Sequence, residues 1–240
     1  NRTRKKHITE MIMQKDPEVV GIYRLTMKTN SEIRQDSLSI MKGNWASGVV
    51  VTLLLFVVVT LCSAITSSFG LCGNKTVMNS ISELLNLLVA IFIFYPLAMS
   101  MVIMFLSFVK SGEKLSAKGL TLGFKSPLYS KSIVLYLLIA IYTLLWSLLL
   151  IVPGIIKSLS YALAPYILAE NPELKANEAI EKSMAMMNGH KMQLFLMWLG
   201  YVGFALLSAL ALGIPLLWLY PYYQVVIAKF YEEVKSEYKV

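Results

Sequence analysis

Two ionisable side chains lie beside long apolar stretches of this chain and could carry chemistry there. Glu83 lies near the start of one stretch and Lys157 lies within another. A charge within a membrane-spanning helix is costly, and it often belongs to an ion or proton pathway. Glu83 and Lys157 are therefore candidates for an ion pair or for the lining of a polar vestibule. The alternative is that each side chain extends back to water along its own apolar stem.

Three uncharged polar side chains, Asn86, Tyr161 and Gln224, are candidates for the same vestibule. Their apolar stretches are interrupted by proline, at Pro96, Pro165 and Pro221. Proline removes a helical hydrogen-bond donor, and broken helices form the binding sites of many transporters. Tyrosine near the end of a span is also typical of the membrane–water interface. A polar cavity and an aromatic belt are thus the alternatives.

No other chemistry is indicated by the sequence. It lacks a Walker A motif, a Gly-x-Ser-x-Gly turn and a His-Glu-x-x-His motif. His7, His190, Cys62 and Cys72 are too few and too scattered for a zinc or iron–sulfur site. We therefore expect no enzyme, no metal and no cofactor. Cys62 and Cys72 lie at or beyond the outer end of the first apolar stretch, where a disulfide and two free thiols are the alternatives.

The composition is typical of a membrane protein. Of the 240 residues, 57% are hydrophobic and 15% are charged, whereas about a quarter of the residues of a soluble domain are charged. Several uncharged runs reach the length of about 18 residues that crosses a bilayer as a helix. These runs predict an all-α, polytopic transmembrane helical bundle. Small residues at Ala205, Ala209 and Gly213 predict close packing of one helix within it.

We expect a polar N-terminal extension over residues 1–26 and a single integral membrane domain over 27–240. The domain is predicted to contain six spans, at about 45–65, 81–109, 132–152, 155–169, 194–212 and 216–231. Two breaks divide longer apolar stretches, at Pro153-Gly154 and at Gly213-Ile214-Pro215. Because proline and glycine permit sharp reversals, each break is either a hairpin or a kink in one long helix.

The distribution of Lys and Arg favours hairpins. Residues 1–44 hold nine of these residues, segment 110–131 holds five and segment 171–191 holds three. Cytoplasmic loops carry the excess of Lys and Arg, and two hairpins place all three segments on that side. Both termini are then cytoplasmic. The net charge of +8 accordingly predicts contact with anionic lipid at the cytoplasmic face and no nucleic-acid binding.

Two short amphipathic helices are expected at the membrane surface. Thr29 and Glu32 form a capping-box pattern that starts a helix ending near Met41. Asn171 is the expected N-cap of a second helix over 172–188. In this second helix the stripe predicted to be buried contains Ile180, Met184 and Met187, with Lys182 exposed.

A weak internal repeat relates the two amphipathic helices. Ser37, Met41 and Gly43 match Ser183, Met187 and Gly189 at a constant offset of 146 residues. Each set lies on a short helix that ends in glycine directly before an apolar stretch. A duplicated helix-and-hairpin unit, as in many transporters, and convergent interfacial chemistry are the alternatives.

The most specific sequence pattern lies between residues 152 and 191. It comprises Pro153-Gly154-Ile155-Ile156-Lys157, Ala164-Pro165, Glu170-Asn171-Pro172-Glu173 and Asn188-Gly189. Together with Ser31-Glu32-Ile33-Arg34, it resembles an uncharacterised family of bacterial multi-pass membrane proteins, numbered 975 among the domains of unknown function. The chain is also similar to the membrane domain fused to some glycerophosphodiester phosphodiesterases, whose soluble domain it lacks. The resemblance covers about residues 27–234. It implies a bacterial plasma membrane and no assigned activity.

Two functions fit these features. The first is a non-enzymatic scaffold, assembly or immunity-type membrane protein that acts through helix packing and lipid contact. The alternative is a small transport or export component with a polar cavity between broken helices. A continuous polar cavity would favour transport, and a solid apolar bundle would favour the scaffold.

Overall fold

The computed structural model describes residues 28–68 and 75–238, and the residues in these ranges form helices and no strand. In chain order the elements are α3 (Asn30–Met41), α4 (Trp45–Ser68), α5 (Lys75–Val89), the π-helix η2 (Ala90–Phe94), α6 (Tyr95–Ser111), the 3₁₀-helix η3 (Ala117–Phe124), α7 (Leu128–Leu149), α8 (Ile151–Tyr161), α9 (Ala164–Glu170), α10 (Ala176–Met186), α11 (Lys191–Leu210) and α12 (Leu216–Tyr238).

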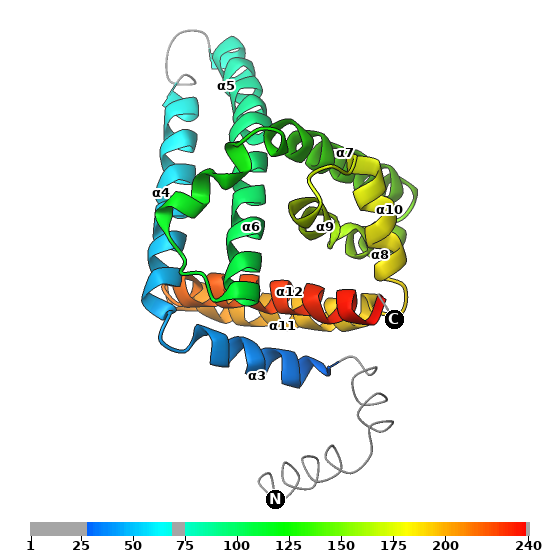
Figure 1. The fold of residues 1–240 in the computed structure, drawn as a ribbon. Coiled ribbons are helices and arrows are strands. Elements are labelled where there is room, and N and C mark those ends of the chain that lie inside the picture. The colour runs from blue at the N-terminus through cyan, green and yellow to red at the C-terminus, as the bar shows by residue number, and fades with distance from the viewer. Residues whose placement is uncertain (1–27, 69–74, 239–240) are drawn as a thin grey trace, which may run out of the picture.

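Helices α4, α5 and α6 form one upright group, in which η2 joins α5 to α6 (Figure 1). Helices α11 and α12 run together across the lower ends of α4 and α6, and α3 lies alongside them (Figure 1). Helix α7 leads away from α6, with α8, α9 and α10 beside it. Buried side chains from α6, α9, α10 and α12 form the main hydrophobic core. The predicted all-α bundle is confirmed.

Five helical segments of the described ranges are long and apolar enough to cross a membrane. They are Trp45–Ser68, Asn79–Ser111, Leu128–Leu149, Ile151–Glu170 and Lys191–Leu210. The sixth predicted span, 216–231, lies within α12, which is not among these five. The second half of α12 carries Lys229, Glu232, Glu233 and Lys235. Such charges make burial of this half in hydrocarbon costly.

The first amphipathic helix starts and ends as predicted. The backbone N–H of Thr29 donates to Glu32 Oε2 at 2.9 Å, and the N–H of Glu32 donates to the Thr29 hydroxyl at 3.4 Å. The bond from the Thr29 backbone lowers the pKa of the Glu32 carboxyl. Helix α3 ends at Met41, and Gly43 follows with a φ of +85°, a conformation that favours glycine.

The second amphipathic helix begins later than predicted, at Ala176 and not at residue 172. Asn171 does not cap it. Its side-chain amide instead donates to the carbonyl of Ile167 at 2.9 Å and ends α9. Of the stripe predicted to be buried, Ile180 in α10 and Met187 directly after it are buried, whereas Met184 is only partly buried; Lys182 is exposed as predicted.

The reversal between α7 and α8 lies three residues before the expected Pro153-Gly154 break. A single extended residue, Leu150, makes the turn with φ −163° and ψ 147°. Pro153 is tolerated in the first turn of α8, because the N–H it lacks would have no helical partner there. A Cβ on Gly154 would lie 2.2 Å from Ser147 Oγ, so glycine at this position allows the two helices to approach closely.

A second break separates α8 from α9 at residues 162–163, shortly before Pro165. A break of this kind frees backbone groups that would otherwise bond along the helix. Ser183 of α10 satisfies two of them. Its hydroxyl donates to the carbonyl of Ser160 at 2.7 Å and accepts the N–H of Leu163 at 3.2 Å. The amphipathic helix therefore holds the break in place.

Replacing Ser183 with alanine should destabilise the protein by about 1–3 kcal/mol, because two backbone groups in the core would lose their partner. Ser37 is the matched control, since it occupies the equivalent place in α3, is equally buried and bonds only within its own helix, to the carbonyl of Ile33 at 2.7 Å. We expect the apparent Tm in detergent to fall more for Ser183→Ala than for Ser37→Ala. Equal decreases would contradict this role.

Candidate functional site

A charged cluster, here called the junction, joins the ends of three helices. It consists of Glu170 at the end of α9, Lys110 in the last turn of α6, and Tyr231 and Lys235 of α12. Glu170 Oε1 accepts from Lys110, and Glu170 Oε2 accepts from Lys235. The Tyr231 hydroxyl donates to Glu170 Oε2 at 2.6 Å. One carboxylate thus accepts from two ammonium groups and a phenol.

The residues around the junction fix the position of its members. The ring of Tyr231 stacks on that of Tyr166, with centroids 5.3 Å apart, and so holds α12 against α9. Both tyrosines are buried. The side chain of Glu170 is only 11% exposed, whereas that of Lys110 is 41% exposed. The junction therefore has a buried anionic centre and a solvent-facing cationic rim.

The two lysines of the junction lie at equivalent places in an internal repeat. Residues 95–111 and 220–236 align at an offset of 125, with identical pairs at Tyr95/Tyr220, Pro96/Pro221, Phe105/Phe230, Val109/Val234, Lys110/Lys235 and Ser111/Ser236. Phe105 and Phe230 are both fully buried. This match, at an offset of 125, favours a repeat over convergence for the two amphipathic helices, which match at an offset of 146. Gly43 and Gly189 share positive φ values of +85° and +88°.

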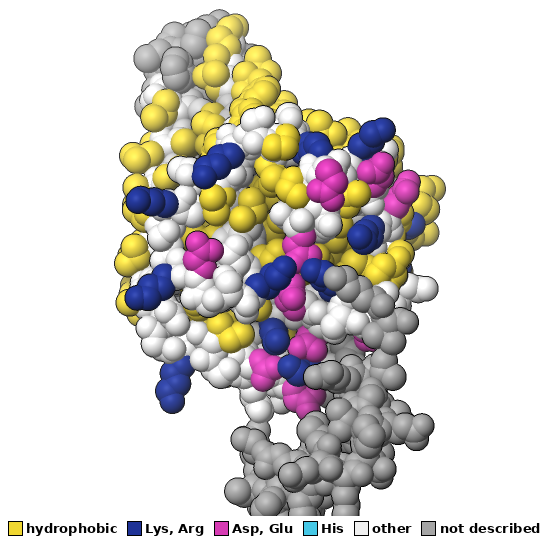
Figure 2. All heavy atoms as spheres, viewed as in Figure 1, with side chains coloured by type: hydrophobic (Ala, Val, Ile, Leu, Met, Phe, Trp, Pro, Cys, Tyr) yellow, Lys and Arg dark blue, Asp and Glu magenta, His cyan; other side chains and the backbone are white. Residues whose placement is uncertain are grey.

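A cavity of about 220 Å³ adjoins the junction. Asn171, Lys182 and Tyr238 line it together with Glu170 and Lys235. On the face seen in Figure 2, Lys, Arg, Asp and Glu side chains lie across the middle and lower part, and hydrophobic side chains lie at the upper end and along the edges. Such a separation of charged and apolar surface is that of a protein with one face in water and its flanks in lipid.

Two of the five predicted vestibule residues, Lys157 and Tyr161, line one cavity. This cavity has a volume of about 310 Å³ and lies between α7, α8 and α10. The ammonium of Lys157 lies 4.7 Å from the ring centroid of Trp146, a cation–π contact. Tyr142 lines the same cavity and donates to Asn177 Oδ1 at 3.2 Å.

The structure places the other three predicted vestibule residues elsewhere. Asn86 Oδ1 accepts from Thr66, a contact between α5 and α4. Gln224 donates to the hydroxyl of Tyr220 within α12 at 2.9 Å. Glu83 is exposed on α5, and the salt bridges among the described residues include none between Glu83 and Lys157. The proposed pair is therefore not formed, because α5 and α8 belong to different parts of the bundle (Figure 1).

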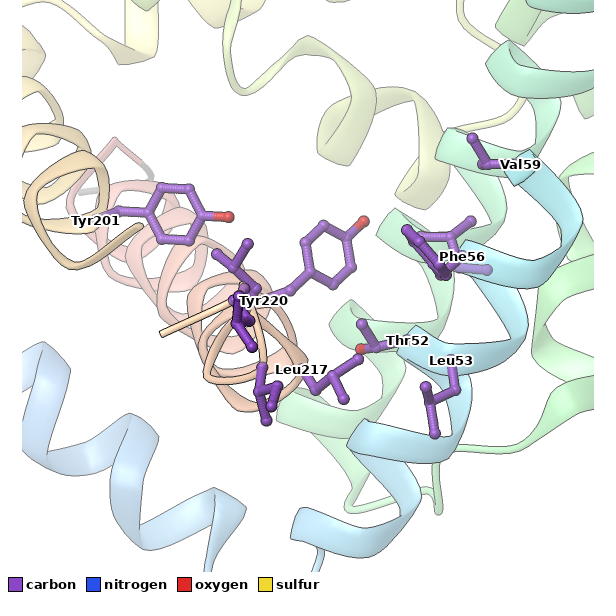
Figure 3. A pocket seen from close by; sticks show the side chains of 12 residues that line it. Thr52, Leu53, Phe56, Val59, Tyr201, Leu217 and Tyr220 are labelled. Atoms are coloured by element: carbon purple, nitrogen blue, oxygen red, sulfur yellow. The ribbon is translucent and has the colours of Figure 1, made fainter. Parts of the chain in front are cut away.

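A third cavity, larger than the two described above, is apolar. It has a volume of about 560 Å³ and lies between α4 and the adjoining ends of α11 and α12. Figure 3 shows Thr52, Leu53, Phe56 and Val59 on one wall, with Tyr201, Leu217 and Tyr220 on the other. We call this cavity the apolar groove.

The predicted packing residues lie on or near the apolar groove. Gly213 lines it, Ala205 is half-buried and Ala209 is exposed. The small residues of α11 are therefore not fully used in contacts within the chain. Cys62 is half-buried near the far end of α4, and Cys72 lies outside the described residues, so their pairing stays a prediction.

The five apolar helices, the charged face and the surface helices define an all-α membrane protein. Comparison with known families gives a more specific result. A profile described as "Protein of unknown function (DUF975)" matches residues 27–158 and 147–238. The chain belongs to this family, and the resemblance noted in the sequence is confirmed.

One curated protein shares a short segment with the chain. It is a UDP-glucose 6-dehydrogenase of Campylobacter jejuni subsp. jejuni serotype O:2, which is 50% identical over 40 residues. The segment is 17% of this chain and 10% of that enzyme, so the likeness is local. No solved structure gives a significant match to the chain.

Substitutions at the junction should destabilise the protein in a defined order. Glu170→Gln should have the largest effect, because two ammonium groups lose their shared partner, and a hydrogen bond to a charged group contributes about 1.5–3 kcal/mol. Lys235→Met should follow. Lys110→Met should cost least, because its side chain is 41% exposed whereas that of Lys235 is 23% exposed, and water weakens the pair.

The apparent Tm of the purified protein in detergent would measure this order. Glu173→Gln is the matched control, because Glu173 lies three residues beyond Glu170 and is exposed. We expect its Tm to equal that of the unaltered protein. Equal effects of the Glu170 and Glu173 substitutions would show that the junction does not hold the helices together.

Proposed function

We propose that this protein is a non-enzymatic scaffold of the bacterial plasma membrane, with both termini in the cytoplasm. It acts through the outward faces of its apolar helices, which bind the transmembrane helices of a partner. The single observation that carries this proposal is the small share of these helices that is buried against the rest of the chain. In the most apolar window of α4, α7 and α11, only 17%, 11% and 17% of the residues are buried.

The charges of the chain support the same proposal. The junction satisfies its own carboxylate from within the chain, and further ion pairs, such as Lys28 with Glu233 at 2.9 Å, tie α12 to the segment preceding α3. The polar contacts thus stabilise the bundle itself. The small residues Ala205 and Ala209 leave part of α11 open to close approach by another helix, the usual basis of helix association in membranes.

A photoreactive amino acid at Leu206 tests the scaffold. Leu206 is exposed on α11, between Ala205 and Ala209. In cells it should give a discrete crosslinked product of defined mass, either with a partner or with a second copy. Ala209→Leu should remove this product by blocking close approach. The same probe at Leu145, exposed on α7, should give a product that Ala209→Leu does not change.

Lipid adducts alone at both positions would contradict the scaffold proposal.

The second candidate is transport, favoured by the cavity of about 310 Å³ in which the ammonium of Lys157 lies over the ring of Trp146. The polar side chains of Tyr142, Tyr161, Asn177 and Glu181 also line this cavity. Transport through this cavity should appear as chloride or nitrate flux from proteoliposomes that Lys157→Met reduces. Lys118→Met is the control, because Lys118 is exposed on η3 away from that cavity. Flux that is equal in both variants and in empty liposomes would reject this route.

A further inference from the structure

Arg34 of α3 is a cation without an acidic partner in the described part of the chain. The ion pairs of the described residues join other cations, such as Lys28 and Lys235, to carboxylates. Arg34 is half-buried in a small cavity between α3, α11 and α12, which Tyr222 and Tyr223 also line. A guanidinium that is partly removed from water binds an anion strongly, and its planar fork suits phosphate.

Gly200 makes the room that the Arg34 side chain needs. A Cβ at position 200 would lie 2.6 Å from Nη2 of Arg34, so a larger residue there would move the end of the Arg34 side chain. The present position of the guanidinium beside α11 thus depends on packing against Gly200.

The level of Arg34 in the membrane follows from its aromatic neighbours. Tyr222 lines the Arg34 cavity, and its ring stacks on Trp45 with the centroids 6.4 Å apart. Trp45 is the first residue of the apolar helix α4. Trp and Tyr at the ends of apolar helices lie at the level of the lipid headgroups. Arg34 consequently lies where lipid phosphates are found.

The apolar groove continues from this site into the hydrocarbon. Tyr201 lines both the Arg34 cavity and the groove. The α4 wall of the groove runs from Thr52 to Val59, which is about 10–21 Å along the helix from Trp45 at 1.5 Å per residue. The hydrocarbon core is about 30 Å thick, so this wall lies at the depth of acyl chains. The apolar groove thus lies next to an unpaired cation and extends to the depth of the acyl chains.

We propose that the apolar groove and Arg34 together bind one anionic phospholipid. Its phosphate lies on the Arg34 guanidinium, and one acyl chain lies between α4 and the ends of α11 and α12. Charge complementarity selects this occupant over a partner helix, because a single molecule then satisfies both the cation and the apolar walls. This site has a defined place beside α3, α4, α11 and α12, unlike the general attraction of a basic face for anionic lipid.

Native mass spectrometry of the full chain in detergent, with added phosphatidylglycerol or phosphatidylcholine, tests the proposal. One phosphatidylglycerol should stay bound per chain, in preference to phosphatidylcholine. Arg34→Gln should reduce its affinity about tenfold, the effect of losing one charge-assisted contact. Gly200→Ala should also weaken binding, by displacing the guanidinium. Lys42→Gln is the matched control, because Lys42 is an exposed cation just beyond the same helix, and it should bind as the unaltered chain does.

A second variant tests the acyl chain independently of the charge. Leu217→Trp would fill the apolar groove and should reduce the bound lipid while leaving Arg34 in place. Several results would overturn the proposal. These are equal losses in Arg34→Gln and Lys42→Gln, equal binding of both lipids, displacement of the lipid by inorganic phosphate alone, or no effect of Leu217→Trp. A second protein helix crosslinked within the groove would also overturn it.

Discussion

Glu170 is the point on which the arrangement of the bundle depends, because α6, α9 and α12 all end beside it. A carboxylate with 11% of its side chain exposed needs partners, and Lys110, Lys235 and Tyr231 supply them from two other helices. Breaking a buried pair costs more than the pair contributes when formed, because the remaining charge stays poorly solvated. The three helix ends are therefore held together by the penalty of separating them.

Serine side chains bond backbone groups near two of the prolines that interrupt helices, Pro165 and Pro96. Ser183 satisfies the backbone between α8 and α9. Ser100, one turn beyond Pro96, donates to the carbonyl of Pro96 at 3.0 Å and accepts the N–H of Gly123 from η3 at 2.8 Å. The 3₁₀-helix η3, within the basic segment 110–131, thus packs on α6. Backbone groups freed within an apolar bundle find partners nearby, as a membrane environment requires.

The sequence predicted those features that a residue's own chemistry decides. The capping box at Thr29, the helix stops at Gly43 and Gly213, and the buried stripe of α10 all depend on local conformation or on helical period. The sequence analysis placed the α7–α8 turn at Pro153-Gly154, whereas the turn lies at Leu150. Gly154 serves the close packing of α8 against Ser147 of α7 and not the turn itself.

The candidate site was harder to predict than the helices. The similar predicted depth of Glu83 and Lys157 in the membrane suggested that they could form a pair. Depth in the membrane does not determine which helices are neighbours. The junction was missed because Glu170, Lys110 and Lys235 each have the character of an ordinary interfacial charge. The repeated Tyr-Pro and Val-Lys-Ser elements at an offset of 125 were the available signal, since they mark Lys110 and Lys235 as equivalent.

The junction pairs two lysines with one carboxylate, and this ratio has an evolutionary consequence. Two copies of a repeated helix contribute one lysine each, while the carboxylate comes from α9, outside both copies. In a relative that loses one lysine, the carboxylate is still paired with the other lysine. In a relative that loses the carboxylate, both lysines are left without an acidic partner. Substitution at position 170 should therefore coincide with changes at both 110 and 235, and substitution at either lysine should occur alone. The two repeats share a single counter-charge, so position 170 is more constrained than either lysine.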